Sequence, residues 1–412
     1  MRMASTISDF AIDQGDPASA PPAVQATFVL LYAETMLGRS NAEAVFVPGL
    51  ETIGPDLAAK ERIGRIQDIE RRLLGDRYQQ AQRVSRQSVG RLALGELIEG
   101  DVVADVYRVS HISGAAAWEV WLTMPAQPLR AQCWIDRLNL TLEGSLAAWI
   151  WRTLNPASSD AAHGRLEAPE LYLPFSILRI PGGDLRSVLS QTGSDLVRLL
   201  HLDGSKERFK PSFVAHELAQ DFCLRDNGLS LLSPRGALDL HCRSADEEQA
   251  ALPLLISLEL LVLERAALRR FHERLRGERT KRLDELLQLK RDVADGLEEY
   301  YGSLAIGNAF SAQTMALGQS LLGIDDLHRS VISRLDMVTF GITTRLGQQT
   351  SRVSLWLAIV FGAIGTGFLA EAIATWYYPE ASALGSVITW TIATTLVTAV
   401  LIAALLHAVT RE

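Results

Sequence analysis

The sequence ends with WLAIVFGAIGTGFLAEAIATWYYPEASALGSVITWTIATTLVTAVLIAALLHAVTRE, residues 356–412. Between Val353 and Tyr378 the only charged side chain is Glu371, and the segment 381–408 contains none. Each segment exceeds the roughly 20 residues that a helix needs to cross the hydrocarbon core of a bilayer. The alternative is a buried hairpin of a soluble core, but such helices rarely stay apolar on every face over this length. The sequence therefore predicts two transmembrane helices, at 353–378 and 383–408.

The flanking residues indicate which side of the membrane each end faces. Arg345 and Arg352 precede the first segment and Arg411 follows the second, whereas the loop at 379–382 contains neither Lys nor Arg. Because cytoplasmic loops are enriched in Lys and Arg, we expect a multi-pass protein of the inner (cell) membrane with both termini in the cytoplasm. Arg345 and Arg352 fit two roles, as topology anchors or as a basic ring at the inner mouth of a pore. Aromatic rings favour the water–lipid boundary, and three stand before the outer loop: Trp376, Tyr377 and Tyr378.

The remainder of the chain divides into parts of different character. The sequence predicts an α+β cytoplasmic domain followed by a long helical stalk and a two-helix transmembrane hairpin. The expected boundaries are a mobile tail at 1–22, an α/β domain at 23–246, long helices and stalk at 247–352, and a cytoplasmic tail at 409–412.

Apolar periodicity places several elements inside the expected α/β domain. Strands are predicted at 44–48, 117–124 and 171–180, a helix or helical pair from 56 to about 97, and a helix at 145–154. Asn227 and Gly228 suit a tight turn with positive φ, so the flanking apolar residues predict an antiparallel meander over 221–242.

Long helices are predicted after residue 246. One apolar stripe at helical spacing runs through Leu261, Leu268, Phe271 and Leu275. Farther on, Gly323 followed by Asp325 and Asp326 indicates a break and then a helix start, because acidic groups favour the positive end of a helix. A continuous helix over 326–378 would measure about 80 Å, so roughly half of it would project beyond the membrane.

Composition and motifs narrow the function classes. A net charge of −8 argues against binding of nucleic acid by the chain as a whole. The sequence has no phosphate loop, no G-x-S-x-G elbow and no H-E-x-x-H helix, so we expect neither an enzyme nor a bound cofactor. Cys223, His241 and Cys242 fall in neighbouring predicted strands and are the candidate metal ligands, but they lack the paired spacing of zinc sites, which favours ordinary core positions.

The order of these parts resembles the CorA family of magnesium transporters. Members carry Gly-Met-Asn at the outer end of the first span, near an aromatic residue, proline and acidic groups. Here the matching segment reads ATWYYPEAS, residues 374–382, in which Tyr378, Pro379 and Glu380 stand in the outer loop region and Gly-Met-Asn is absent. The resemblance implies a pentamer around a pore lined by the first span.

Candidate pore-lining residues follow one helical face of the first span. They are Val360, Ile364, Gly367, Glu371 and Thr375. Rings of Val360 and Ile364 could form a dewetting gate, and a ring of Glu371 at the outer mouth would attract cations. The alternatives are that Glu371 simply reaches water at the outer interface, and that the glycines of this span serve close helix packing.

Two functions are compatible with these features. The first is a homo-oligomeric, CorA-like cation channel or transporter gated by its cytoplasmic domain, with membrane lipid and copies of itself as partners and a divalent cation as substrate. The second is a membrane-anchored sensor or effector without transport activity.

Overall fold

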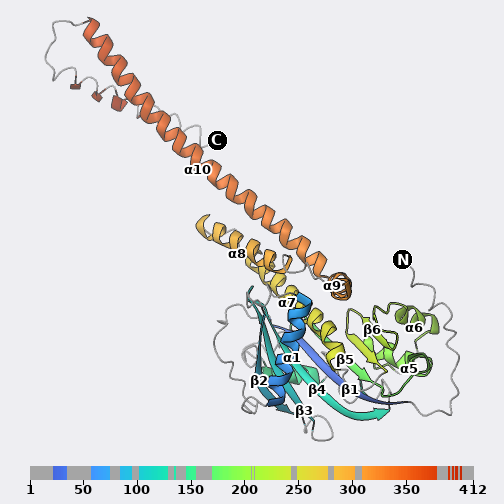
Figure 1. Ribbon diagram of the computed structural model, residues 1–412. Helices are drawn as coiled ribbons and strands as arrows, with labels where there is room; N and C mark the ends of the chain where they lie inside the picture. The colour runs from blue at the N-terminus through green and yellow to red at the C-terminus, as the bar shows by residue number, and fades with distance from the viewer. Residues whose placement is uncertain are drawn as a thin grey trace. The chain divides into compact units, whose positions relative to one another are not determined.

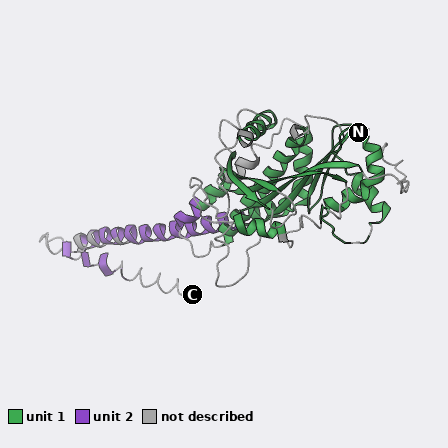
Figure 2. Cartoon of the chain, turned by 90° about the horizontal axis from the view of Figure 1, so that it is seen from below, with its two compact units in different colours: residues 1–279, 289–335 green, residues 280–288, 336–412 purple. Residues whose placement is uncertain are grey.

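The computed structural model in Figure 1 describes most of the chain between residues 22 and 377. The described residues are 22–34, 57–74, 84–94, 102–128, 134–135, 145–154, 169–205, 207, 209–242, 248–276, 283–301, 309–377 and a few between 388 and 400. Two compact units are distinguished in Figure 2: residues 1–279 with 289–335, and residues 280–288 with 336–412. We call the first unit the sheet unit.

A seven-stranded mixed sheet organises the sheet unit, in the order β2-β3-β4-β1-β5-β7-β6. Neighbouring strands are antiparallel except β5 and β7, which run parallel. The strands are β1 (Ala23–Ala33), β2 (Val84–Ala93), β3 (Val103–His111), β4 (Ala116–Pro128), β5 (Tyr172–Arg179), β6 (Gly228–Leu232) and β7 (Ala237–His241).

Helices lie between these strands along the chain and follow the last of them. They are α1 (Leu57–Leu74), α4 (Ser145–Leu154), α5 (Leu185–Leu200), α6 (Pro211–Leu218), α7 (Glu248–Arg276), α8 (Leu283–Tyr301), α9 (Ala309–Leu321) and α10 (Ile324–Tyr377). The described part of the chain is thus a mixed α+β sheet domain followed by helices, as the sequence predicts at this level.

The main apolar core lies between one face of the sheet and the helices α4 and α5. Aromatic residues dominate it: the ring centroids of Phe28 and Trp134 are 5.2 Å apart, and the ring of Tyr32 stacks on Trp151 at 5.7 Å. The hydroxyl of Tyr32 donates a hydrogen bond of 3.2 Å to the carbonyl of Ala147 in α4. Since a buried hydroxyl without a partner would cost stability, this bond lets a tyrosine occupy the core.

Helices α1 and α7 cover the opposite face, where α1 contacts β2, and α7 contacts β1, β4, β5 and α1 (Figure 1). The predicted stripe of α7 is confirmed, because all four of its members are buried: Leu261, Leu268, Phe271 and Leu275. Helix α7 also packs against α9, so closely that a Cβ at Gly318 would lie 2.2 Å from Leu261 Cδ1. A larger residue at position 318 would require the buried Leu261 side chain to move.

Several predicted elements are confirmed, and two are confirmed only in part. The strands at 117–124 and 171–180 and the helix at 145–154 are present as β4, β5 and α4. The predicted helical pair at 56–97 is wrong in its second half, which is strand β2. A bulge between Ser88 and Gly90 interrupts the alternation of inward and outward side chains there, so the strand lacks a clean period of two.

The predicted turn at Asn227–Gly228 is present, but without the predicted positive φ. The N–H of Gly228 donates to the carbonyl of Arg225 at 3.2 Å, and neither Asn227 nor Gly228 has a positive φ. Gly228 begins β6, and the antiparallel β6–β7 hairpin turns over residues 233–236. The Ser233 hydroxyl accepts hydrogen bonds from the backbone N–H groups of Arg235 and Gly236 at 3.2 and 3.1 Å. This local bonding makes Ser-Pro-Arg-Gly the turn.

Helix α10 begins directly after Gly323, whose φ of +66° ends the preceding helix. It continues for 54 residues without a break, which corresponds to about 80 Å. The predicted continuous helix is therefore confirmed up to Tyr377. The predicted second membrane helix and outer loop, the tail at 1–22 and the strand at 44–48 lie wholly or mostly outside the described residues.

Candidate functional site

The second half of α10 exposes apolar side chains over most of its circumference, although Ile359 is buried. Those with at least 46% of their surface exposed include Val353, Trp356, Leu357, Val360, Phe361, Ile364, Phe368, Leu369, Ile373 and Trp376. Among the described residues, α10 is the one helix whose length and composition suit a bilayer crossing, and only 12% of its most apolar stretch is buried. A surface of this kind requires an apolar environment around the whole helix.

The predicted pore-lining residues all lie on α10. Val360 and Ile364 are exposed and Gly367 is buried. Glu371 and Thr375 continue the same helical face by their spacing, but their side chains lie outside what the structure describes.

The other predicted residues of the membrane region are divided between described and undescribed positions. Arg345 is partly exposed and Arg352 is exposed, both on α10 before the apolar half. Tyr378, Pro379 and Glu380 lie outside the described residues, so their assignment to an outer loop stays a prediction.

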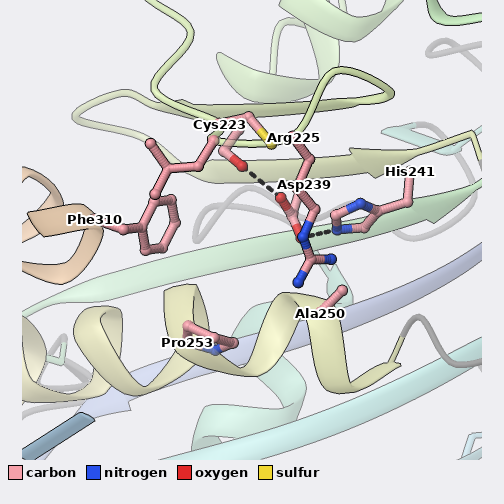
Figure 3. Close-up of a pocket in the computed structure, with 9 residues that line it drawn as sticks. Cys223, Arg225, Asp239, His241, Ala250, Pro253 and Phe310 are labelled. Carbon is pink, nitrogen blue, oxygen red and sulfur yellow. Dashed lines mark hydrogen bonds and ion pairs between the residues drawn. The ribbon is translucent and has the colours of Figure 1, made fainter. Parts of the chain in front are cut away.

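A cavity of about 140 Å³ opens in the sheet unit, beside the ends of β6 and β7 (Figure 3). Its polar wall comes from the loop before β6 and from the two strands, and its apolar wall comes from α7 and α9. The lining residues are Cys223, Leu224, Arg225, Ser230, Asp239, His241, Ala250, Pro253 and Phe310.

A chain of hydrogen bonds orders the polar wall. The carboxylate of Asp239 accepts from Ser230 Oγ at 2.6 Å and lies 2.6 Å from His241 Nε2 (Figure 3). Asp221 lies behind the wall, where its Oδ1 accepts the backbone N–H groups of Cys223 and Ser230 at 2.8 and 2.9 Å. The loop and both strands are thus fixed by two carboxylates.

Burial raises the pKa values of two groups at this wall, Asp221 and Cys223. Desolvation raises the pKa of Asp221 to about 6, although the two backbone N–H groups favour its charged form. Desolvation also raises the pKa of the Cys223 thiol. At neutral pH Cys223 is therefore a neutral thiol rather than a thiolate nucleophile.

Gly228 keeps the space between Cys223 and His241 open. A Cβ at this position would lie 2.8 Å from Cys223 Sγ and 3.3 Å from His241 Nδ1. These two side chains therefore share one corner of the cavity, whereas Cys242 is buried in the core on the other face of the sheet. Among the described residues, no group of three or more His, Cys, Asp or Glu is arranged to hold a metal ion, so the candidate metal site of Cys223, His241 and Cys242 is not formed.

The sequence pattern did not indicate the residues that complete this cavity. Asp239 and His241 alternate on β7 and so point to the same face, which is a signal that the sequence carries. Phe310 comes from a helix about 70 residues farther along the chain, and no local pattern places it here.

Comparison with known proteins gives no relative: no family model, no curated protein and no solved structure matches the chain.

Proposed function

We propose that the protein is an integral membrane protein that assembles as a homo-oligomer and passes cations across the bilayer, in the manner of the CorA-like class. The single observation that carries this proposal is the apolar half of α10, exposed over most of its circumference and continuous with a polar half of the same helix. The sheet domain followed by this helix supports the resemblance in architecture.

The energetic argument concerns the large exposed side chains. Trp356, Phe361, Phe368 and Trp376 are 65 to 78% exposed, and burying each such side chain in an apolar environment is worth on the order of 2 kcal/mol. The hydrocarbon core of a bilayer supplies this environment along the whole apolar half, since about 20 helical residues span it. Insertion is therefore the arrangement that removes this surface from water.

Cation passage rests on Glu371 and on assembly. A carboxylate within an apolar helix is costly in lipid, so it favours a water-filled path or a partner. One or two helices cannot enclose such a path, and several copies around a common axis can. The ring of Glu371 side chains would then attract cations to one mouth of the pore.

Uptake by liposomes that contain the purified full chain tests this proposal. Magnesium, a transition-metal ion and potassium are offered separately under an inside-negative potential. We expect saturable uptake of one ion, at least tenfold weaker in Glu371→Ala. Asp336→Ala, on the same helix before its apolar half, is the matched control and should transport normally. Absence of uptake from a folded oligomer would refute cation passage.

A second candidate function, a membrane-anchored sensor, is favoured by the cavity beside β6 and β7. A cavity with one ordered polar wall and one apolar wall suits a small ligand. Filling it with Gly228→Leu distinguishes the two functions. If the protein is a pore and the cavity plays no part in conduction, this variant should conduct at an unchanged maximal rate, provided that the sheet unit stays folded. If the protein is a sensor, the variant should lose its response to the ligand.

A further inference from the structure

Arg86 lies at the centre of a buried group of charges on the α1/α7 face of the sheet. Its Nε lies 3.1 Å from Glu119 Oε2, and its Nη1 lies 3.1 Å from Glu70 Oε1. Its Nη2 donates to Glu259 Oε2. The four residues belong to β2, β4, α1 and α7, and none of their side chains is more than 8% exposed. We call this group the Arg86 cluster.

One guanidinium does not satisfy the three carboxyls. The second oxygen of Glu119 accepts the indole N–H of Trp121. Glu259 Oε1, by contrast, is buried without a hydrogen-bond donor. Glu119 and Glu259 accept from Nε and Nη2 of the same guanidinium, so their carboxyl groups lie next to each other. Two carboxyls in contact can form a hydrogen bond only if one of them carries a proton.

The charges next to the cluster lead to the same conclusion. Arg62 and Arg91 both pair with Asp105, at 2.7 and 2.9 Å. Arg62 also lies over the ring of Trp121 and donates to the hydroxyl of Tyr107 at 3.0 Å. Among the described residues, these three guanidinium groups lie among four carboxyls, those of Glu70, Asp105, Glu119 and Glu259. A proton bound to one of the buried carboxyls reduces the excess of negative charge around Arg86.

We propose that the Arg86 cluster is a proton-binding site, in which Glu259 holds a proton at neutral pH and donates it to Glu119 while α7 is docked on the sheet. Release of this proton would leave two buried carboxylates in contact. The repulsion would weaken the docking of α7, since an uncompensated buried charge is strongly unfavourable. The site is independent of the proposed cation passage.

The pKa directions agree with this geometry. Burial raises the pKa of Glu259 well above its ordinary value, and Glu119 and Glu70 add to the increase, whereas Arg86 opposes it. Burial also raises the pKa of Glu70, against the opposing effect of Arg86. Burial alone would lower the pKa of Arg86, but Glu259, Glu119 and Glu70 raise it above its ordinary value, so the guanidinium stays charged.

The sign of the resulting pH dependence follows from proton linkage. In the unfolded chain Glu259 loses its proton near pH 4.5, whereas in the folded protein it keeps the proton to a higher pH. Its stabilising contribution is complete below about pH 4.5 and is lost as the pH rises through the folded pKa. Within this interval the unfolding equilibrium constant should increase up to tenfold per pH unit on account of this group.

Infrared spectroscopy of the full chain in detergent micelles tests the proposal directly. At pH 7 we expect the carbonyl band of a protonated carboxyl in the wild type and its loss in Glu259→Gln. Glu119→Gln is the second variant. It should also lose the band, because its amide can donate to an ionised Glu259. Glu273→Gln, a half-exposed position on α7, should keep it.

Urea unfolding between pH 5 and pH 8, followed by tryptophan fluorescence, provides a second readout. The wild type should lose stability with rising pH more steeply than Glu259→Gln, and Glu273→Gln should follow the wild type. The proposal is overturned if the wild type shows no protonated carboxyl at pH 7. It is also overturned if the band disappears in Glu70→Gln but persists in Glu259→Gln.

Discussion

The sheet unit and the second half of α10 depart from the usual distribution of residues in opposite ways. The sheet unit buries Arg86 together with three carboxyl groups, none of them more than 8% exposed, whereas α10 leaves Phe361 and Trp376 at least 67% exposed. Burial of charge is tolerable only with partners, and exposure of a long apolar surface is tolerable only with an apolar environment. The first requirement is met by the described residues of the sheet unit, and the proposed membrane insertion would meet the second.

The largest effect should come from removing Arg86, the cation that neutralises the buried carboxyls of its cluster. Arg86→Met retains most of the volume but leaves three buried carboxyls without a cation, which should lower the free energy of unfolding by about 3 to 5 kcal/mol at pH 7. Urea unfolding measures this change. Arg71→Met, on the exposed side of α1, is the control and should change stability by less than about 0.5 kcal/mol. Equal stability of the two variants would mean that Arg86 is not the required counter-charge.

A slightly smaller effect should come from placing a charge within the apolar half of α10. Phe368→Lys places an ammonium within the apolar half of α10, away from the candidate pore-lining residues, and the change from Phe to Lys costs about 3 kcal/mol near the membrane centre. The fraction of the full chain that resists carbonate extraction from membranes should fall. Phe340→Lys, a similarly exposed phenylalanine before this half, should leave the fraction unchanged. If both variants stay fully in the membrane, α10 is not the spanning element.

The smallest effect concerns a buried charge that has only backbone partners. The pKa of Asp221 is raised to about 6, so its stabilising contribution is present below about pH 4 and is lost as the pH rises through 6. Asp221→Asn keeps an oxygen that accepts the same two N–H groups. Relative to the wild type, this variant should gain about 2 to 3 kcal/mol of stability between pH 4 and pH 7. Parallel stability curves for the two proteins would contradict the raised pKa.

The sequence predicts those features of the fold whose causes are local. The apolar run of β4, the amphipathic stripe of α7 and the Gly323 break before α10 each depend on residues within a few positions of one another. Strand β2 was not predicted from its local sequence, because its bulge at Ser88–Gly90 interrupts the alternation of inward and outward side chains. Strand β3 was not predicted, because Asp105, Tyr107 and Arg108 make it look polar until their partners are known.

The candidate sites also differed in how far the sequence predicted them, because one depends on local residues and the other on distant ones. The exposed half of α10 follows from composition alone, because every face of the helix is apolar. The Arg86 cluster does not, because the partners of Arg86 lie 16, 33 and 173 residues away along the chain. Charged residues such as Glu70 and Arg86 are normally solvated, so only the pairing of distant elements shows that they are buried.

The separation of 173 residues along the chain between Arg86 and Glu259 also implies a delay during synthesis. At 5 to 20 residues per second a ribosome needs about 10 to 35 s to synthesise this length of chain. During that interval the nascent sheet holds Arg86, Glu70 and Glu119 without α7, and only α1 covers its second face. Newly made chains should therefore be most prone to aggregation just before α7 emerges, and the arrival of that helix completes both the charge balance and the apolar cover in one step.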